Sequence, residues 1–233
     1  MLDFHKFDVL TFDCYGTLID WETGILKAVR NVLRRHSLEF DDQSILDAYA
    51  RAEAKYEAAA YEPYTDVLRK VMKEMSAELL IEPTDAELGA IARSIPDWRP
   101  FPDTIRSLRR LKQRYQLGII SNIDDDLFQF TAERLEVPFD FVVTAQQAES
   151  YKPSHNNFQM ALGRIGGQKD KVLHVAQSIY HDIVPARDLG LTTVWVNRRS
   201  KQEGSGATPP AEGKADFEVP DLESFADVVE SLA

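Results

Sequence analysis

Cysteine is nearly absent from this sequence of 233 residues, in which Cys14 is the only thiol. A single cysteine excludes an internal disulfide and is typical of a protein in a reducing compartment. No apolar run approaches the roughly 20 residues that a membrane-spanning helix needs. The first residues also lack a charged segment followed by an apolar one, as an export signal would have. The sequence therefore predicts a cytoplasmic protein with no membrane partner.

Basic residues are also in short supply. Lysine and arginine number 27 against 38 aspartates and glutamates, which gives a net charge of −11. This balance predicts no nucleic-acid partner, because phosphate backbones are bound by clustered cations. Any site for an anionic substrate must therefore gather its cations locally, against the overall field.

Short apolar runs alternate with helical patterns over much of the chain. The run at 7–12 ends at Asp13, and later strands are expected at 117–120, 139–144, 172–176, 193–196 and 217–219, with a closing helix at 222–232. Such alternation predicts an α/β fold, with a mostly parallel sheet and helices on both faces. The polar segment 198–214 is rich in glycine, serine and proline, and predicts a mobile loop.

Strand-like runs are missing between residues 20 and 98, where helical spacing prevails, including an expected helix over 84–93. This shift in pattern predicts an all-helical insertion. We expect one domain formed by residues 1–18 and 99–233, and a second, helical domain formed by residues 19–98.

Polar side chains collect at the ends of the expected strands, where open α/β sheets bind their ligands. They are Asp13, Tyr15 and Thr17 after the first strand, then Ser121 and Asn122, Lys152, and finally Gln177, Ser178 and Asp182. Each has an ordinary explanation alone: Asp13 or Asp182 as a cap, Ser121 and Asn122 as a helix start, Lys152 as a solvated lysine. Together they predict an active site.

The motifs hhhhDxxGTL, hhSN, KP and hhxxSxxxD, in which h is an apolar residue, follow one another in this order. The pattern resembles the haloacid dehalogenase (HAD) superfamily of hydrolases. The resemblance implies a Rossmann-like core, with the helical insertion as its cap domain. It further implies Asp13 as covalent nucleophile, Ser121 and Lys152 as groups that position its adducts, and Asp182 as the last acid of the site.

Two positions depart from the phosphatases of that superfamily, whose first motif reads DxDGT. Tyr15 replaces the second aspartate, and a phenol of pKa about 10 is a weak proton donor near neutral pH. Gln177 stands where a phosphatase typically carries aspartate, and an amide removes charge from a Mg²⁺ site. Asp13 and Asp182 remain as the metal ligands of a phosphatase alternative.

The segment from Asp13 to Leu18, DCYGTL, resembles the D-x-Y-G-T-L motif of the (S)-2-haloacid dehalogenases (type II). This resemblance implies that Asp13 displaces halide from a small anionic 2-haloacid, and that water hydrolyses the ester to a 2-hydroxyacid. Asp182 would position the water and Lys152 would counter the charge of Asp13, with no cofactor. Halide leaves as a stable anion, so Tyr15 costs nothing in such a reaction.

The remaining expectations concern substrate binding. Arg51 resembles the cap arginine that the family places near the substrate carboxylate, although an exposed helical arginine is about equally expected there. Tyr15, Thr17, Ser121, Asn122, Gln177 and Ser178 complete the expected substrate-binding set. Gln177-Ser178-Ile179 replaces the family's Ser-Ser-Asn, and Phe158 replaces a tyrosine.

Three alternatives stay open at this point. The first is the dehalogenase, and the second is a phosphatase with Mg²⁺ held by Asp13 and Asp182. The third is a catalytically weak protein that binds a small anion. A homodimer is compatible with the apolar face of the first helix of the insertion.

Overall fold

The computed structural model describes residues 2–202 and 204–231, so Leu232 of the expected closing helix lies outside the described residues. Six strands form one parallel sheet in the order β5-β4-β1-β6-β7-β8. Their bounds are β1 Val9–Phe12, β4 Gln116–Ser121, β5 Phe141–Thr144, β6 Val172–Ala176, β7 Thr192–Val196 and β8 Phe217–Val219. Each predicted strand is found, which confirms the α/β fold.

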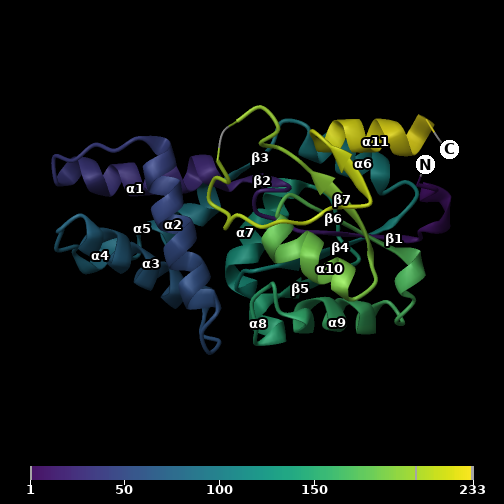
Figure 1. Cartoon of the computed structure of the whole chain (residues 1–233), viewed down its shortest axis with the longest axis horizontal. Coiled ribbons are helices and arrows are strands. Elements are labelled where there is room, and N and C mark those ends of the chain that lie inside the picture. Colours follow the sequence, from purple (N-terminus) through teal and green to yellow (C-terminus); the bar gives the residue numbers. More distant parts are fainter. Residues whose placement is uncertain (1, 203, 232–233) are drawn as a thin grey trace.

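Helices cover both faces of this sheet (Figure 1). On one face lie α6 (Thr104–Leu111) and α11 (Leu222–Ser231), and on the other lie α9 (His155–Arg164) and α10 (Val184–Asp188). The apolar side chains of the strands point alternately to the two faces. Val9 accordingly packs in the cluster beneath α9, whereas Leu10 belongs to the larger core cluster. The remaining elements of this part are α7 Asp125–Leu135, α8 Ala145–Ala148, and the short helices η1 Phe4–Lys6, η3 Lys169–Lys171 and η4 Ile179–Ile183.

The register places the expected site residues at one edge of the sheet. Phe12, the last residue of β1, lies opposite Ile119 of β4 and Val175 of β6. Asp13 continues this ladder, because its backbone N–H donates to the carbonyl of Val175. The carboxyl ends of the three central strands therefore meet around Asp13.

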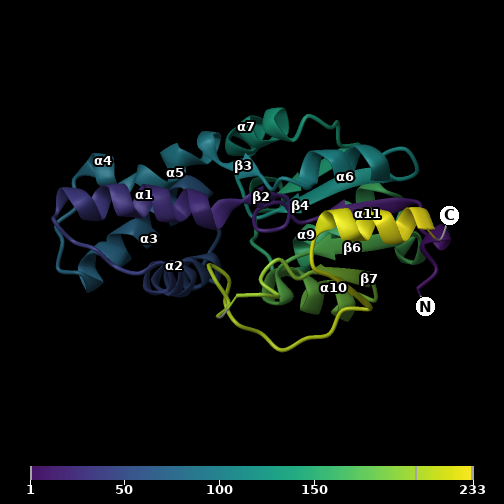
Figure 2. The ribbon, with the colours of Figure 1, turned by 90° about the horizontal axis from the view of Figure 1, so that it is seen from above.

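The segment between β1 and α6 is helical, as predicted. Its elements are α1 Trp21–Arg35, α2 Asp42–Glu57, α3 Tyr64–Glu78, α4 Asp85–Leu88, α5 Ala90–Ser94 and η2 Ile95–Asp97, which we refer to as the cap helices. Figures 1 and 2 show them together at one end of the molecule, with both chain termini at the opposite end. The helix expected over 84–93 is interrupted at Gly89, which separates α4 from α5.

Two short strands that the sequence did not predict join the cap helices to the rest of the chain. They are β2 (Ile19–Asp20) and β3 (Arg99–Pro100), which pair antiparallel to each other. The chain therefore enters and leaves the cap helices at adjacent points. They lie at the limits that we expected, and we retain 19–98 as the cap domain and 1–18 with 99–233 as the core domain as a proposal.

The segment expected as a mobile loop reaches back to the cap helices. Arg199 donates to Glu22 Oε2 at 2.6 Å, and the backbone N–H of Ala207 donates to Glu22 Oε1 at 2.9 Å. Ala207 and Thr208 are buried. The mobility of this segment stays a prediction.

Within the described part of the chain, no helix combines the length and the apolar character needed to cross a membrane.

Candidate active site

Asp13 stands at the end of the central strand, just before a tight turn. The turn closes through the Leu18 N–H, which donates to the Cys14 carbonyl at 2.7 Å. Gly16 sits in it at φ +92°, where a side chain would be strained and would also press on Trp21. Thr17 then points its hydroxyl back at Asp13 Oδ2, to which it donates at 2.6 Å. The sequence GTL thus fixes the orientation of the carboxylate.

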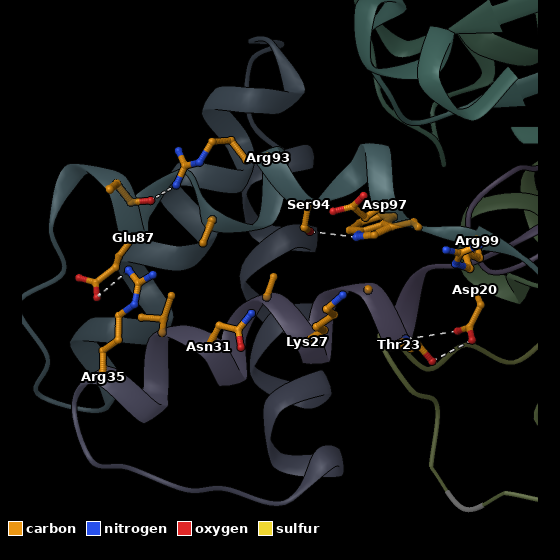
Figure 3. A pocket seen from close by; sticks show the side chains of 16 residues that line it. Asp20, Thr23, Lys27, Asn31, Arg35, Glu87, Arg93, Ser94, Asp97 and Arg99 are labelled. Atoms are coloured by element: carbon orange, nitrogen blue, oxygen red, sulfur yellow. Dashed lines mark hydrogen bonds and ion pairs between the residues drawn. The ribbon is translucent and has the colours of Figure 1, made fainter. Parts of the chain in front are cut away.

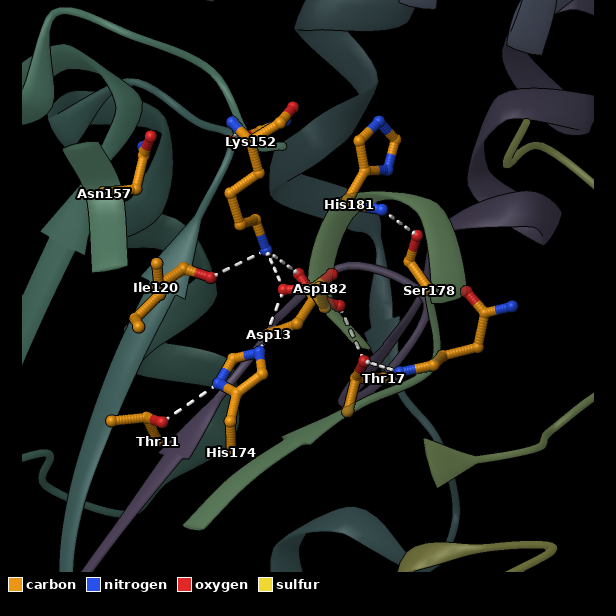
Figure 4. A network of polar contacts seen from close by, with 12 residues as sticks. Thr11, Asp13, Thr17, Ile120, Lys152, Asn157, His174, Ser178, His181 and Asp182 are labelled. Carbon is orange, nitrogen blue, oxygen red and sulfur yellow. Dashed lines mark hydrogen bonds and ion pairs between the residues drawn. The ribbon is translucent and has the colours of Figure 1, made fainter. Parts of the chain in front are cut away.

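Lys152 joins the two acids of the site (Figure 4). Its Nζ donates to Asp13 Oδ1 at 2.8 Å, to Asp182 Oδ1 at 2.7 Å and to the Ile120 carbonyl at 2.9 Å. The side chain is 2 % exposed, so all three of its N–H donors are used inside the protein. Lys152 therefore neutralises carboxylates of the chain itself.

Burial and this shared cation set the charges of the two acids. Burial raises the pKa of Asp13, with Lys152 offsetting part of that effect. Burial would also raise the pKa of Asp182, but Lys152 and His174 outweigh it and lower that pKa. The same two carboxylates outweigh desolvation at Lys152 and raise its pKa, so the lysine stays charged. At neutral pH the cluster carries an ionised Asp182 beside an ammonium.

His174 supports Asp182 from behind. Its Nδ1 is hydrogen-bonded to the Thr11 hydroxyl at 2.9 Å, and its Nε2 lies 3.1 Å from the ionised Asp182 Oδ1, to which it donates. The edge of the Phe158 ring packs on the imidazole, with ring centroids 5.2 Å apart. Lys152 and His174 both contact Oδ1, and Asp182 Oδ2 is buried without a hydrogen-bond partner. One oxygen of Asp182 is therefore open to a ligand.

Asn122 holds the backbone of Lys152 and also contacts the cap helices. Its Oδ1 accepts the Lys152 N–H at 2.7 Å, and its Nδ2 donates to the Lys152 carbonyl at 3.1 Å. The same Nδ2 donates to Glu57 Oε1 of α2 at 3.0 Å. Ser121, the preceding residue, is buried with its Oγ unpartnered. Asn122 is thus placed to position Lys152, whereas Ser121 has a free hydroxyl.

These groups surround a small, partly open cavity of about 30 Å³. Its walls come from both parts of the molecule: Asp13, Tyr15, Ser121, Asn122, Lys152, Ser178, His181, Asp182 and Thr208 from the sheet edge and its loops, and Trp21, Glu53, Glu57 and Tyr64 from the cap helices. A volume of this size holds about two water molecules.

Two of the expected substrate-binding residues line this cavity with their polar groups turned to the protein. The Tyr15 hydroxyl is 2.7 Å from Thr131 Oγ1, and burial raises the pKa of the phenol well above 10. Ser178 Oγ accepts the N–H of His181 at 2.8 Å. Tyr15 therefore offers its ring to the cavity and is an even weaker proton donor than a free phenol.

The position of Arg51 corrects our expectation. The side chain of Arg51 is 62 % exposed and donates to Glu78 of α3 at 3.2 Å, so it does not line the cavity. Successive residues of a helix are 100° apart, which places Arg51 nearly opposite Glu53 on α2. The ordinary alternative, an exposed helical arginine in an ion pair, is the observed one.

Gln177 also differs from the expectation. Its backbone N–H donates to Thr17 Oγ1 at 2.8 Å, and its carbonyl accepts the Trp195 indole N–H at 2.8 Å. The side chain lines a separate cavity beside Gly16 and Arg198. Gln177 therefore holds Thr17 through its backbone. Its side chain does not line the cavity at Asp13, whereas the next residue, Ser178, does.

Glu53 and Glu57 are the residues that the sequence did not point to. Glu53 Oε1 accepts the hydroxyls of Tyr49 and Tyr64, the former at 2.6 Å. Burial, together with the neighbouring Glu57, raises the pKa of Glu53 to about 8, and burial raises the pKa of Glu57 to about 8. Tyr49, Glu53 and Glu57 are spaced by four residues, a stripe on one face of α2 that could have indicated them.

Asp124 ties the cap helices to the sheet edge. Helix α3 has no side-chain cap of its own at Pro63. Instead, Asp124 accepts the N–H groups of Tyr64 at 2.9 Å and Thr65 at 3.1 Å. A carboxylate at a helix N-terminus satisfies free N–H groups and the helix dipole. This contact holds α3 against the loop that follows β4.

A second cavity, of about 530 Å³, lies among the cap helices and the β2–β3 pair (Figure 3). Among its charged groups, the Arg93 guanidinium donates to the Ala86 carbonyl, the Asp20 carboxylate accepts the Thr23 hydroxyl, and Arg35 lies 3.9 Å from Glu87. It contains no group comparable to Asp13 with its lysine. The smaller cavity is therefore the candidate active site.

A Mg²⁺ ion does not fit the residues of this site as a phosphatase would require. Asp13 Oδ1 and Asp182 Oδ1 both face Lys152 Nζ, and the side chain of Gln177 lies elsewhere. Among the residues that the structure describes, no group of three or more histidines, cysteines or acids is placed to hold a metal ion. We therefore derive no step through a metal.

Known proteins agree with this architecture. A family model described as haloacid dehalogenase-like hydrolase matches residues 7–190. The (S)-2-haloacid dehalogenase of Pseudomonas sp. (strain YL) is 24 % identical over 238 residues, which cover 96 % of this chain and 95 % of that protein. The glyceraldehyde 3-phosphate phosphatase of Methanocaldococcus jannaschii is 29 % identical over 140 residues, 58 % of each chain.

A solved structure shows the same fold. The L-2-haloacid dehalogenase from Xanthobacter autotrophicus superposes with a TM-score of 0.79 at 22 % identity, covering 97 % of this chain and all of the other. At this identity the likeness concerns the fold alone. The family model, however, spans most of the chain, so this protein belongs to the haloacid dehalogenase-like hydrolases.

Proposed function

We propose that the protein hydrolyses the carbon–halogen bond of a small 2-haloacid through a covalent ester on Asp13. The observation that carries this proposal is the Asp13 carboxylate, which faces a small cavity with Lys152 beside it and Tyr15 in place of a proton-donating acid. The relatives named (S)-2-haloacid dehalogenase, which match nearly the whole chain, support the same reaction.

The first step is a displacement at carbon. An Asp13 oxygen attacks the carbon that bears the halogen, the carbon–oxygen bond forms, and the carbon–halogen bond breaks with its electron pair leaving on the halide. No proton is needed for this departure. Thr17 and Lys152 hold the carboxylate in place, and the burial of Asp13 limits the access of competing water to it.

The second step is hydrolysis of the ester. Water attacks the ester carbonyl of Asp13, the alkoxyl group leaves as the hydroxyl of the product, and the Asp13 carboxylate is restored. Asp182 is the residue that we assign to the water, since its Oδ2 is buried and has no hydrogen-bond partner. Overall, haloacid and water give hydroxyacid, halide and a proton.

A phosphatase is the second candidate, because one relative that matches over half of this chain is named a phosphatase. Tyr15 and the displaced Gln177 side chain speak against it, since the first is a poor proton donor and the second leaves the metal ligands incomplete. A catalytically weak protein that binds an anion remains the third alternative, and a homodimer stays a prediction.

The test is halide release with EDTA present, from chloroacetate and (S)-2-chloropropionate. We expect stoichiometric halide and no effect of EDTA, and we expect Asp13→Asn to lose about 10⁴-fold or more in rate. When the reaction is run in ¹⁸O-water, peptide mass spectrometry should find the label in Asp13, because water attacks the enzyme's own carboxyl carbon. Phosphate-ester hydrolysis that requires Mg²⁺, with no halide release, would point to the phosphatase instead.

A further inference from the structure

The candidate active site is rich in acids and poor in available cations. The acids that line it are Asp13, Glu53, Glu57 and Asp182, and the bases are Lys152 and His181. An anion that enters this cavity has to come close to the ionised Asp182, and like charges at short range disfavour such binding. Glu53 and Glu57 have raised pKa values and are therefore neutral in the empty site at neutral pH.

Neither lysine nor arginine offers a free cation to a substrate carboxylate among the described residues that line the cavity. Each N–H of Lys152 already donates to an acceptor of the chain, namely Asp13, Asp182 and the Ile120 carbonyl. Arg51 lies on the outer face of α2 and pairs with Glu78. Burial lowers the pKa of His181, which keeps its imidazole neutral at neutral pH.

The cap side of the cavity has an unsatisfied acceptor. Glu57 has a side chain that is 4 % exposed, and only its Oε1 is hydrogen-bonded, to Asn122. Its Oε2 has no hydrogen-bond partner, and the nearest base, His181 Nε2, lies 3.4 Å away and is itself unpartnered. Buried polar atoms are rarely left in this state unless a ligand or water completes them.

Glu53, one turn earlier on α2, is oriented for the same purpose. Tyr49 and Tyr64 donate their hydroxyls to Oε1 of Glu53. Two phenols that donate to one oxygen fix the plane of the carboxyl group and direct it as an acceptor. Glu53 and Glu57 together therefore give the cavity a wall of acceptors.

We propose that Glu53 and Glu57 form a subsite for an ammonium group, so that the preferred substrate is a small haloacid that also carries an amine. The inference rests on the proposed function, because it assigns the substrate class of the Asp13 reaction. An ammonium brings three N–H donors and a positive charge, which match unpartnered carboxylate oxygens, whereas a second carboxylate brings acceptors only.

The charges of the empty site agree with this assignment. Burial raises the pKa of both glutamates to about 8, because no cation on the cap side compensates them. A bound ammonium favours the ionised form of a neighbouring carboxyl group and supplies the missing compensation. Glu53 and Glu57 thus accept hydrogen bonds from the substrate ammonium, as Asp13 and Asp182 accept them from the Lys152 ammonium.

The test compares two 2-haloacids that differ by one ammonium group, 3-amino-2-chloropropionate and 2-chloropropionate. We expect kcat/KM for chloride release to favour 3-amino-2-chloropropionate by at least about tenfold, as for a charge-assisted contact of about 1.4 kcal/mol or more. Glu57→Gln should reduce that ratio toward one, and Glu53→Gln provides an independent variant. Glu78→Gln, on the exposed side of α3, is the matched control and should leave the ratio unchanged.

A binding measurement separates failure of this inference from failure of the proposed function. Unreactive ethylammonium and propionate are titrated into the wild-type chain by calorimetry, with ethylammonium expected to bind more tightly and to lose affinity in Glu57→Gln. Halide release from neither substrate would refute the dehalogenase, and the titration would still decide the subsite. Equal or better turnover of 2-chloropropionate, an unchanged ratio in Glu57→Gln, or no ethylammonium binding would overturn the ammonium subsite.

Discussion

The acids on the two sides of the active-site cavity have different hydrogen-bond donors. On the sheet side, Asp13 and Asp182 share Lys152, and His174 and Thr17 add further donors. On the cap side, Glu53 and Glu57 receive hydrogen bonds from neutral groups only. The sheet edge therefore supplies its own cation for its ionised acid, whereas the cap helices hold two carboxyl groups that stay protonated until a cation binds beside them.

The largest expected effect comes from removing the shared cation. Lys152→Met would leave two buried carboxylates facing each other, which should cost about 3–5 kcal/mol of stability. We expect loss of about 10³-fold or more in halide release, and a lower midpoint in urea unfolding. Adding Asp182→Asn should restore part of the stability but not the activity. If Lys152→Met unfolds like the wild type, the sheet-side charges are not coupled as described.

The buried glutamates of the cap helices predict that the free energy of unfolding depends on pH, because burial raises their pKa. Folded Glu57 holds its proton up to about pH 8, whereas the unfolded chain releases it near pH 4.5. Between these values the folded state binds more protons, so the free energy of unfolding should fall as pH rises. Each pH unit contributes up to about 1.4 kcal/mol for one proton. Glu57→Gln should therefore gain about 4 kcal/mol over the wild type between pH 5 and pH 9.

The check is urea unfolding of both proteins at several pH values, with Glu78→Gln as an exposed control. Parallel stability curves for the wild type and Glu57→Gln would mean that Glu57 is ionised in the empty site. The contrast between the two sides of the cavity would then be lost.

A smaller effect is expected where the two sides are joined. Asp124→Ala removes the carboxylate that caps α3, which should cost about 1–2 kcal/mol. Hydrogen exchange of the first amides of α3 should become faster, while the amides of β1 keep their protection. Equal changes in α3 and β1 would show that the cap helices and the sheet unfold as one unit.

The smallest effect should come from Arg51→Ala. Its ion pair with Glu78 is exposed, and such pairs contribute about 0–1 kcal/mol. We expect a change of less than about twofold in kcat/KM for any haloacid. If steady-state kinetics instead show that kcat/KM falls 100-fold or more, Arg51 binds substrate. Helix α2 would then have to turn its Arg51 face toward the cavity when substrate is bound.

The sheet edge was predictable from the sequence, and the cap side was not. Parallel strands align their carboxyl ends, which predicted Asp13 and Ser121 at one edge of the sheet. Lys152 and Asp182 stand several residues beyond β5 and β6, and the resemblance to the haloacid dehalogenase superfamily supported their place in the site. Which face of α2 meets that edge depends on how the cap helices pack, which apolar periodicity does not specify. Arg51 and Glu53 are two residues apart and lie on nearly opposite faces of α2. Which face meets the sheet edge determines whether a cation or an acid lines the cavity.

Gln177 shows a related limit. It follows β6 directly, and strand order correctly brings it to the edge of the sheet. Its backbone continues toward Thr17 and its side chain turns away from Asp13, because the chain bends there before Ser178. A position within a motif predicts where the backbone lies, but the direction of a side chain at a bend follows from local dihedral angles.

The antiparallel pair of β2 and β3 has a consequence for how such a protein changes through evolution. The cap helices depart from the core and return to it through two adjacent two-residue strands, far from both termini. Insertions, deletions or replacement of helices beyond this pair leave the register of the parallel sheet unaltered. A lineage can therefore exchange the lining of its pocket as one module while it inherits the nucleophile and its lysine intact.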